Sequence, residues 1–236
     1  MCGRFTFTDP NLLPDAFGVS GPIPELAPRY NIAPSQSIAV IALKRNGDER
    51  AVALLKWGLV PSWANDPRRG IRPINARSDS LDKPMFRDAF RSQRCLIPAD
   101  GFYEWTTAGR KKSATHFKMK DSSPFAFAGL WEFWSDGVEK LATCAIITTD
   151  ANEVVAAVHN RMPVIVPKSG YGAWLSNETP RGELLALLKP YPFEDMVGVP
   201  VGTKVNSVSS TGRDPLPVEG ENPGLTGLNE DGADLR

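Results

Sequence analysis

Five strand-like runs follow one another in the middle of the chain: residues 94–98 (RCLIP), 101–106 (GFYEWT), 115–120 (THFKMK), 125–133 (FAFAGLWEF) and 140–149 (KLATCAIITT). Most of the connections between them are short and polar or contain glycine. Tight turns join antiparallel neighbours, whereas parallel strands need long crossover connections that are usually helical. The runs therefore predict an antiparallel α+β domain and argue against a doubly wound fold.

The flanking segments extend this prediction. Residues 37–43 and 50–57 are apolar runs on either side of Asn46-Gly47-Asp48, and this arrangement predicts a hairpin. Short helices are expected at residues 9–17, 84–92, 152–157, 171–175 and 181–188. Further strands are expected at residues 2–8, 162–167, 193–199 and 204–209, with long loops at 18–28 and 58–73.

Composition predicts one folded domain followed by a tail. The chain has 236 residues, and its 42% of hydrophobic residues can form a substantial core. Residues 213–236 hold six acidic and two basic residues among glycines and prolines, without periodicity. We expect a domain at residues 1–212 and a disordered acidic tail at 213–236. The domain then carries a net charge of about +4, which by itself is too mild to identify a DNA-binding protein.

The three cysteines, Cys2, Cys95 and Cys144, are far apart, and no Cys-x-x-Cys pair occurs. This pattern favours neither a disulfide framework nor a zinc site, and it suggests a reducing compartment. No signal peptide or membrane span is expected, because charged or polar residues interrupt every apolar run. We therefore expect a cytoplasmic protein with no metal and no cofactor.

The second residue, Cys2, has unusual chemical potential. Once Met1 is removed, Cys2 carries a free α-amine and a thiol on neighbouring carbons. An amine condenses with a carbonyl to give a Schiff base, and a thiolate is a strong nucleophile. Together the two groups can close on an aldehyde to form a five-membered thiazolidine. The alternative is that Cys2 merely begins a strand.

Three further residues are candidates for proton transfer or positioning. His159 is expected at a turn between a helix and a strand, where it is either a general acid–base or a capping side chain. Glu104 lies between Tyr103 and Trp105, so it is either desolvated, with a raised pKa, or turned to water by strand alternation. Asn75 offers amide donors and an acceptor. The other histidine, His116, is expected at the surface or on an edge.

Aromatic and basic side chains suggest nucleic-acid contacts. Tryptophans can stack on bases and arginines can bind phosphates. The candidates are Trp57, Trp63 and Trp105 for bases, and Arg4, Arg77 and Arg161 for phosphates. The alternative is that the tryptophans belong to the core.

A second reading of the same residues is a thiol peptidase. Cys2, His159 and Asn75 are the residue types of a Cys-His-Asn triad, and such triads assemble from distant parts of a sequence.

Seven motifs in order give the chain a family resemblance. They are 1–4 (MCGR), 30–34 (YNIAP), 57–61 (WGLVP), 75–78 (NARS), 94–98 (RCLIP), 101–105 (GFYEW) and 159–163 (HNRMP). Together they resemble the SOS response-associated peptidase family over about residues 2–210. The resemblance implies a single α+β domain with a mainly antiparallel, β-barrel-like core flanked by short helices and a basic cleft.

The resemblance also implies a function. Members of this family recognise abasic sites in single-stranded DNA, including single-strand/double-strand junctions, and bind them covalently through the N-terminal cysteine as a reversible thiazolidine. By similarity Cys2 is the nucleophile, Glu104 assists proton transfers, His159 helps ring opening and reversal, and Asn75 orients Cys2 or the sugar. DNA contacts are implied for Arg4, Trp63, Arg77, Met85, Trp105 and Arg161.

We expect a monomer in the bacterial cytoplasm, associated with the nucleoid when it acts on DNA. The family name refers to an autoproteolytic peptidase, but only Met1 precedes Cys2 here, and a general methionine aminopeptidase can remove it. A thiol autopeptidase and a non-covalent DNA-binding module remain the alternatives.

Overall fold

The structure is a computed structural model that describes residues 2–44, 47, 49–108 and 111–209. Met1 and the acidic tail expected at residues 213–236 lie outside the described residues, as do Asn46 and Asp48 of the expected hairpin turn.

Five strands close into a barrel. The order around it is β10 (Lys140–Asp150), β4 (Arg50–Trp57), β3 (Ser37–Leu43), β6 (Arg94–Ala99) and β9 (Phe125–Ser135), and β9 pairs again with β10. Every neighbouring pair is antiparallel except β10 and β4, which are parallel. The predicted hairpin at residues 37–43 and 50–57 is confirmed with the expected bounds, and the predicted α+β class with a barrel-like, mainly antiparallel core is also confirmed.

Three short strands attach to the barrel. β5 (Asn75–Arg77) runs parallel to β10, and β11 (Arg161–Pro163) runs antiparallel to the same strand. β12 (Ile165–Val166) pairs with β9. The carboxyl-terminal half of β10 thus holds both β5, which carries Asn75, and β11, which carries Arg161.

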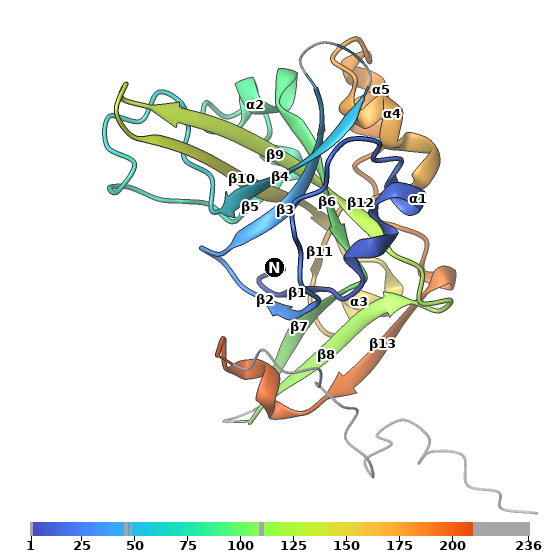
Figure 1. The fold of residues 1–236 in the computed structure, drawn as a ribbon. Coiled ribbons are helices and arrows are strands. Elements are labelled where there is room, and N and C mark those ends of the chain that lie inside the picture. The colour runs from blue at the N-terminus through green and yellow to red at the C-terminus, as the bar shows by residue number, and fades with distance from the viewer. Residues whose placement is uncertain (1, 45–46, 48, 109–110, 210–236) are drawn as a thin grey trace, which may run out of the picture.

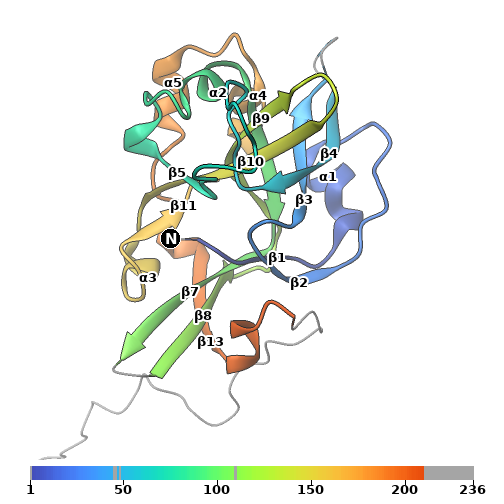
Figure 2. The same ribbon diagram turned by 90° about the vertical axis from the view of Figure 1, so that its left-hand side faces the viewer.

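A second, fully antiparallel sheet lies against the barrel (Figure 1). Its order is β13 (Met196–Val201), β8 (Lys111–Met119), β7 (Gly101–Ala108), β1 (Phe5–Phe7) and β2 (Arg29–Ile32). Phe5 joins the two units, because its ring lies 5.4 Å from that of Trp57 and 5.7 Å from that of Phe127. The start of the chain therefore runs between barrel and sheet, as Figure 2 shows from the side.

Small residues let the barrel strands approach closely. A side chain at Gly129 of β9 would place its Cβ 2.7 Å from the Cys95 sulfur on β6. The described helices are short: α1 (Leu13–Phe17), α2 (Arg87–Ser92), α3 (Glu153–Ala156), α4 (Tyr171–Leu175) and α5 (Arg181–Ala186). In the described part of the chain, none has the length and apolar composition that a membrane-spanning helix needs.

Several local predictions were wrong. Residues 204–209 do not form a strand, because Thr203–Asn206 is a 3₁₀ helix (η5) and only Val205 of its side chains is buried. The expected strand at 193–199 begins with a 3₁₀ helix, Phe193–Asp195, and β13 starts at Met196. The expected helix at 84–92 begins only at Arg87, and the strand at 2–8 covers only Phe5–Phe7. β2 was not predicted at all.

Candidate active site around Cys2

Cys2 is enclosed between the barrel and the second sheet. It is fully buried and belongs to the main hydrophobic core, and its Sγ lies 3.7 Å from the Arg4 carbonyl oxygen. The Asn75 side chain holds its backbone, because Nδ2 donates to the Cys2 carbonyl oxygen at 2.8 Å. Asn75 is itself placed by β5, which pairs with β10, and by the preceding Ile74, whose carbonyl accepts from Trp57 Nε1 at 2.8 Å.

Asn75 has one further polar atom at this site. Its Oδ1 is buried and has no hydrogen-bond partner within the described residues. An amide oxygen in this state is an acceptor that a nearby ammonium or amine can satisfy.

Glu104 completes the buried polar group next to Cys2. The side chain is 3% exposed, so the alternative in which strand alternation turns it to water is wrong. Tyr103 lies in a separate cluster with Ala114, Val201 and Val205, and Glu104 points to the opposite face of β7. Burial raises the pKa of Glu104. Burial also raises the pKa of the Cys2 thiol, and the Glu104 charge raises it further.

His159 is held in a defined orientation beyond α3. The Asn152 side chain caps that helix by accepting from Val155 N at 3.0 Å, and the His159 backbone N–H donates to the Val155 carbonyl. His159 Nδ1 accepts from the Arg161 N–H at 3.0 Å. The neutral ring therefore carries its proton on Nε2. Burial lowers the pKa of His159, which favours this neutral form.

The three candidate phosphate-binding arginines differ in accessibility. Arg77 is exposed and paired with Asp79 at 2.6 Å, whereas half-buried Arg4 donates to Asn31 Oδ1 at 2.8 Å and to the Val205 carbonyl at 2.9 Å. Arg161 is only 7% exposed, and its guanidinium contacts Asp150 at 2.9 Å and the Thr148 carbonyl at 2.5 Å. The contacts of Arg161 thus support the turn that carries His159.

The candidate base-stacking residues also separate by burial. Trp63 is 58% exposed, whereas Trp57 is fully buried, so of the two alternatives for Trp57 the one that places it in the core is confirmed. Trp105 is half-buried and donates from Nε1 to Asn206 Oδ1 at 2.7 Å, and the Lys112 amine lies 5.0 Å from its ring centre. Met85 is partly buried against the core.

Sequence reasoning assigned no role to Asn31, which the structure connects to this site. Its Oδ1 accepts from Arg4, and its Nδ2 donates to the Ser207 carbonyl at 2.9 Å. The only signal for it was its position inside the motif at residues 30–34.

Among the described residues, the hydrogen bonds of Asn75 and His159 differ from those of a Cys-His-Asn triad. In such a triad the asparagine orients the histidine. Here the Asn75 amide donates to the Cys2 carbonyl, and His159 Nδ1 accepts from the Arg161 backbone.

His116 lies elsewhere and is half-buried, and the prediction that it lies on an edge strand was wrong. Its strand β8 lies between β7 and β13, and its ring stacks on Tyr103 at 4.6 Å. His116 Nε2 lies 3.3 Å from Thr6 Oγ1, which donates to Asp100 at 2.5 Å. Burial lowers the pKa of His116 to about 4.

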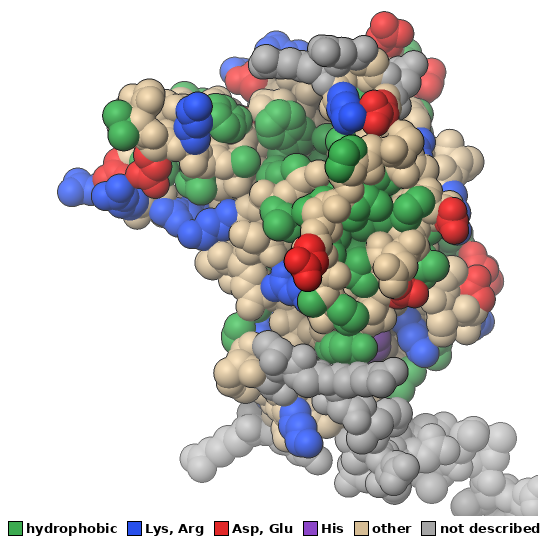
Figure 3. Space-filling view, viewed as in Figure 1, with side chains coloured by type: hydrophobic (Ala, Val, Ile, Leu, Met, Phe, Trp, Pro, Cys, Tyr) green, Lys and Arg blue, Asp and Glu red, His purple; other side chains and the backbone are tan. Residues whose placement is uncertain are grey.

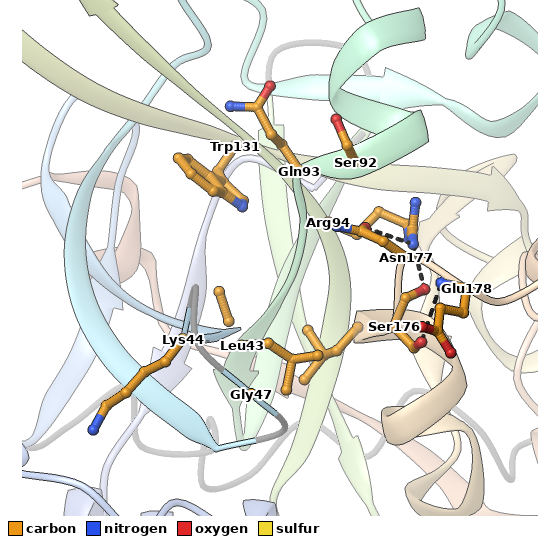
Figure 4. A pocket seen from close by; sticks show the side chains of 12 residues that line it. Leu43, Lys44, Gly47, Ser92, Gln93, Arg94, Trp131, Ser176, Asn177 and Glu178 are labelled. Atoms are coloured by element: carbon orange, nitrogen blue, oxygen red, sulfur yellow. Dashed lines mark hydrogen bonds between the residues drawn. The ribbon is translucent and has the colours of Figure 1, made fainter.

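Two cavities lie away from Cys2. One, of about 440 Å³, is lined by His116 and Asp100. The larger, of about 740 Å³, is lined by Trp131, Gln93 and Arg94 among others (Figure 4). Arg94 cannot donate freely to a ligand there, since its guanidinium already donates to the carbonyls of Phe90, Arg91, Trp174 and Ser176 and to the Asn177 side chain.

Basic side chains gather on one projection of the molecule. The β9–β10 hairpin and the loop at residues 58–73 form the projection on the left of Figure 1, and Figure 3 shows Lys and Arg side chains along its lower edge. Arg68, Arg69 and Arg72 belong to this loop. Within the described residues no group of three or more His, Cys, Asp or Glu side chains is arranged to hold a metal ion.

Comparison with known proteins gives consistent relatives. The model of the SOS response associated peptidase (SRAP) family matches residues 1–208. Abasic site processing protein YoqW of Bacillus subtilis is 43% identical over 88% of this chain and 95% of its own length. Abasic site processing protein YoaM of the same organism is 42% identical over 93% of this chain and 99% of its own length. A solved structure of a Bacteroides thetaiotaomicron protein covers 91% of this chain and 98% of that protein, with a TM-score of 0.81 and 26% identity.

Proposed function

The chain belongs to the SOS response associated peptidase family, and from this premise we propose that it processes abasic sites in DNA. The target is an abasic site in single-stranded DNA, including single-strand/double-strand junctions, and the product is a reversible thiazolidine crosslink to Cys2 that shields the lesion. Relatives at 42–43% identity are abasic site processing proteins, which supports the substrate class. We propose that the protein acts as a monomer.

One observation carries the proposed chemistry. Asn75 donates to the carbonyl of buried Cys2, and the charge of a buried carboxylate, Glu104, raises the pKa of the Cys2 thiol. An aldehyde trap needs an amine, a thiol and a proton carrier in one water-poor space. These three groups meet at Cys2 once Met1 has been removed.

The reaction proceeds in two bond-forming steps. The α-amine of Cys2 adds to the C1′ aldehyde of the ring-opened abasic sugar, and loss of water gives a Schiff base. The Cys2 sulfur then adds to the same carbon while its proton passes to the Glu104 carboxylate, and the protonated Schiff-base nitrogen becomes the neutral N–H of the thiazolidine. Glu104, whose pKa burial raises, supplies the proton for the loss of water and can take it back during reversal.

In the proposed reaction His159 acts on the sugar, and five further side chains contact the strand. The Nε2–H of neutral His159 is a donor for the sugar oxygen during ring opening and release. Arg4 and Arg77 contact phosphates, and Trp63, Met85 and Trp105 contact bases. We assign Arg161 to the support of His159, because its guanidinium is already held by Asp150 and Thr148.

A second candidate function, thiol autoproteolysis through Cys2, His159 and Asn75, shares the same nucleophile. This second function would be supported if the wild-type protein cleaved peptide substrates and the Cys2→Ala variant did not.

The central experiment measures intact mass after the protein is mixed with single-stranded DNA containing one abasic site. We expect a chain lacking Met1 to gain the mass of the DNA minus one water, and Cys2→Ala to give no denaturation-resistant thiazolidine adduct. Cys2→Ala protein that forms the same stable adduct would refute the proposal. His159→Ala is expected to slow release of the adduct more than its formation, and equal release rates would remove that role.

A further inference from the structure

The loop at residues 58–73 presents one large aromatic side chain to solvent. Trp63 is 58% exposed, whereas the neighbouring Trp57 and Trp134 are 0% and 4% exposed. An exposed indole on a basic loop is typical of a binding surface rather than of a folding core. The flanking backbone, however, is not loosely attached.

The residue after Trp63 is hydrogen-bonded to β9, and the residue before it interacts with a carboxyl group of the same strand. The indole Nε1–H of buried Trp134 donates to the Ala64 carbonyl at 2.6 Å. Burial raises the pKa of Glu132, and hydrogen bonding from Ser62 opposes that rise. Because residues alternate faces along a strand, Glu132 and Trp134 point from the same side of β9 towards the loop.

The adjoining strand, β10, adds a third anchor. Val60 N–H donates to Thr143 Oγ1 at 2.9 Å, and Thr143 is the cross-strand partner of Glu132. A turn closes around Trp63 itself, with Ala64 N–H donating to the Pro61 carbonyl at 3.0 Å. The backbone on both sides of the exposed indole is therefore fixed.

Glu132 is a carboxyl group whose burial at this position is energetically unfavourable. It is 3% exposed, and its Oε2 has no hydrogen-bond partner within the described residues. Burying a carboxyl group is unfavourable unless it makes hydrogen bonds that compensate. Ser62, which precedes Trp63, opposes the rise in the pKa of Glu132 that burial causes.

We propose that Glu132, Trp134 and Thr143 are positioning residues that hold Trp63 as a rigid stacking platform for a base of the bound strand. This inference rests on the proposed function, and it assigns to the β9–β10 hairpin a role in strand affinity. Holding the loop before binding avoids the entropy cost of ordering it on the DNA. The anchors act through Trp63, and they have no part in the covalent step at Cys2.

The first test removes one hydrogen bond without removing a ring. Trp134→Phe keeps the aromatic bulk and deletes the N–H that Ala64 accepts. We expect the dissociation constant for single-stranded DNA without an abasic site to rise about three- to tenfold, by the usual net contribution of a hydrogen bond. The crosslinking rate at saturating abasic DNA should remain within twofold of wild type.

A matched control lies on the same strand. Trp131 is half-buried, faces the cavity on the other side of the barrel wall and receives the same substitution, Trp131→Phe, which should leave DNA affinity unchanged. At the carboxylate, Glu132→Gln preserves an acceptor for Ser62 and should bind DNA more tightly than Glu132→Leu.

A double-mutant cycle separates positioning from a general structural effect. In a Trp63→Ala background, Trp134→Phe should cause no further loss of affinity, because the platform is already gone. Equal losses of affinity in both backgrounds would overturn the inference. Hydrogen exchange of a peptide covering residues 58–66 gives a readout independent of DNA, and it should accelerate in Trp134→Phe.

The two proposals fail in different ways. Wild-type protein that neither binds nor crosslinks the strand would refute the proposed function and, with it, the DNA role of Trp63. Faster exchange at residues 58–66 in Trp134→Phe, together with unchanged DNA affinity and normal crosslinking, would refute only the role of the anchors.

Discussion

The hydrogen bond from Asn75 to Cys2 gives the sharpest prediction about the reaction. Asn75→Ala removes the Nδ2 donor that lies 2.8 Å from the Cys2 carbonyl. Cys2 is 0% exposed, so water cannot easily replace the lost donor. Leaving a buried acceptor unsatisfied costs about 1–3 kcal/mol. If the reactive placement of Cys2 depends on this bond, the crosslinking rate constant should fall about 5- to 150-fold.

The assay is single-turnover crosslinking at saturating abasic DNA, followed by denaturing electrophoresis. Saturation removes any effect on DNA affinity from the measured rate. Asn177→Ala is the matched control, because Asn177 contacts Arg94 beside the distant cavity and should react at the wild-type rate. An Asn75→Ala rate within twofold of wild type would show that the bond does not position the nucleophile.

Three further predictions concern titration and stability. Glu104→Gln should lower the crosslinking rate by about 10²- to 10⁴-fold, the usual contribution of a general acid–base, as measured in the same single-turnover assay. Burial lowers the pKa of His116 to about 4, so as the pH falls the unfolded chain binds a proton at His116 before the folded chain does. The contribution of His116 to the free energy of unfolding should be complete above about pH 6.5 and fall by up to about 3 kcal/mol towards pH 4. Urea unfolding measures this change, which should be smaller in His116→Gln. Arg94→Met leaves several buried carbonyls without a donor and should lose about 3 kcal/mol or more in the same unfolding measurement, whereas exposed Arg91→Met should lose less than about 0.5 kcal/mol.

The fold was predictable where the pattern is local. Alternation and turn residues gave the 37–43 and 50–57 hairpin and the central antiparallel strands. The closure of the barrel was not predictable, because it depends on the parallel pairing of β4 with β10, strands that lie more than eighty residues apart. A strand of four residues such as β2 has no period of its own, and its position follows from pairing with β1.

The site shows the same division between local and distant information. The proposal for Cys2 comes from its position in the chain rather than from its surroundings, because removal of Met1 would give it an α-amine. The burial of Glu104 could not be predicted from the sequence, because strand alternation predicts that one of Tyr103 and Glu104 faces solvent. In the structure the sheet is covered on both sides, so both residues are buried. His116 was misplaced for a related reason: β13, which turns β8 into an interior strand, arrives eighty residues later in the chain.

The burial of Cys2 also orders the proposed steps, which the sequence left open. In a model peptide the α-amine and the thiol titrate within about one pH unit of each other, so either could attack first. Burial and the Glu104 charge raise the pKa of the Cys2 thiol, which keeps the sulfur protonated near neutrality. A protonated thiol is a poor nucleophile. Within the proposed reaction the amine therefore attacks first, and the sulfur closes the ring only after the Schiff base has formed and a base has taken its proton. Glu104 is the buried carboxylate whose charge raises the pKa of that thiol, and in the proposed reaction the same group receives the thiol proton after it has protonated the departing water.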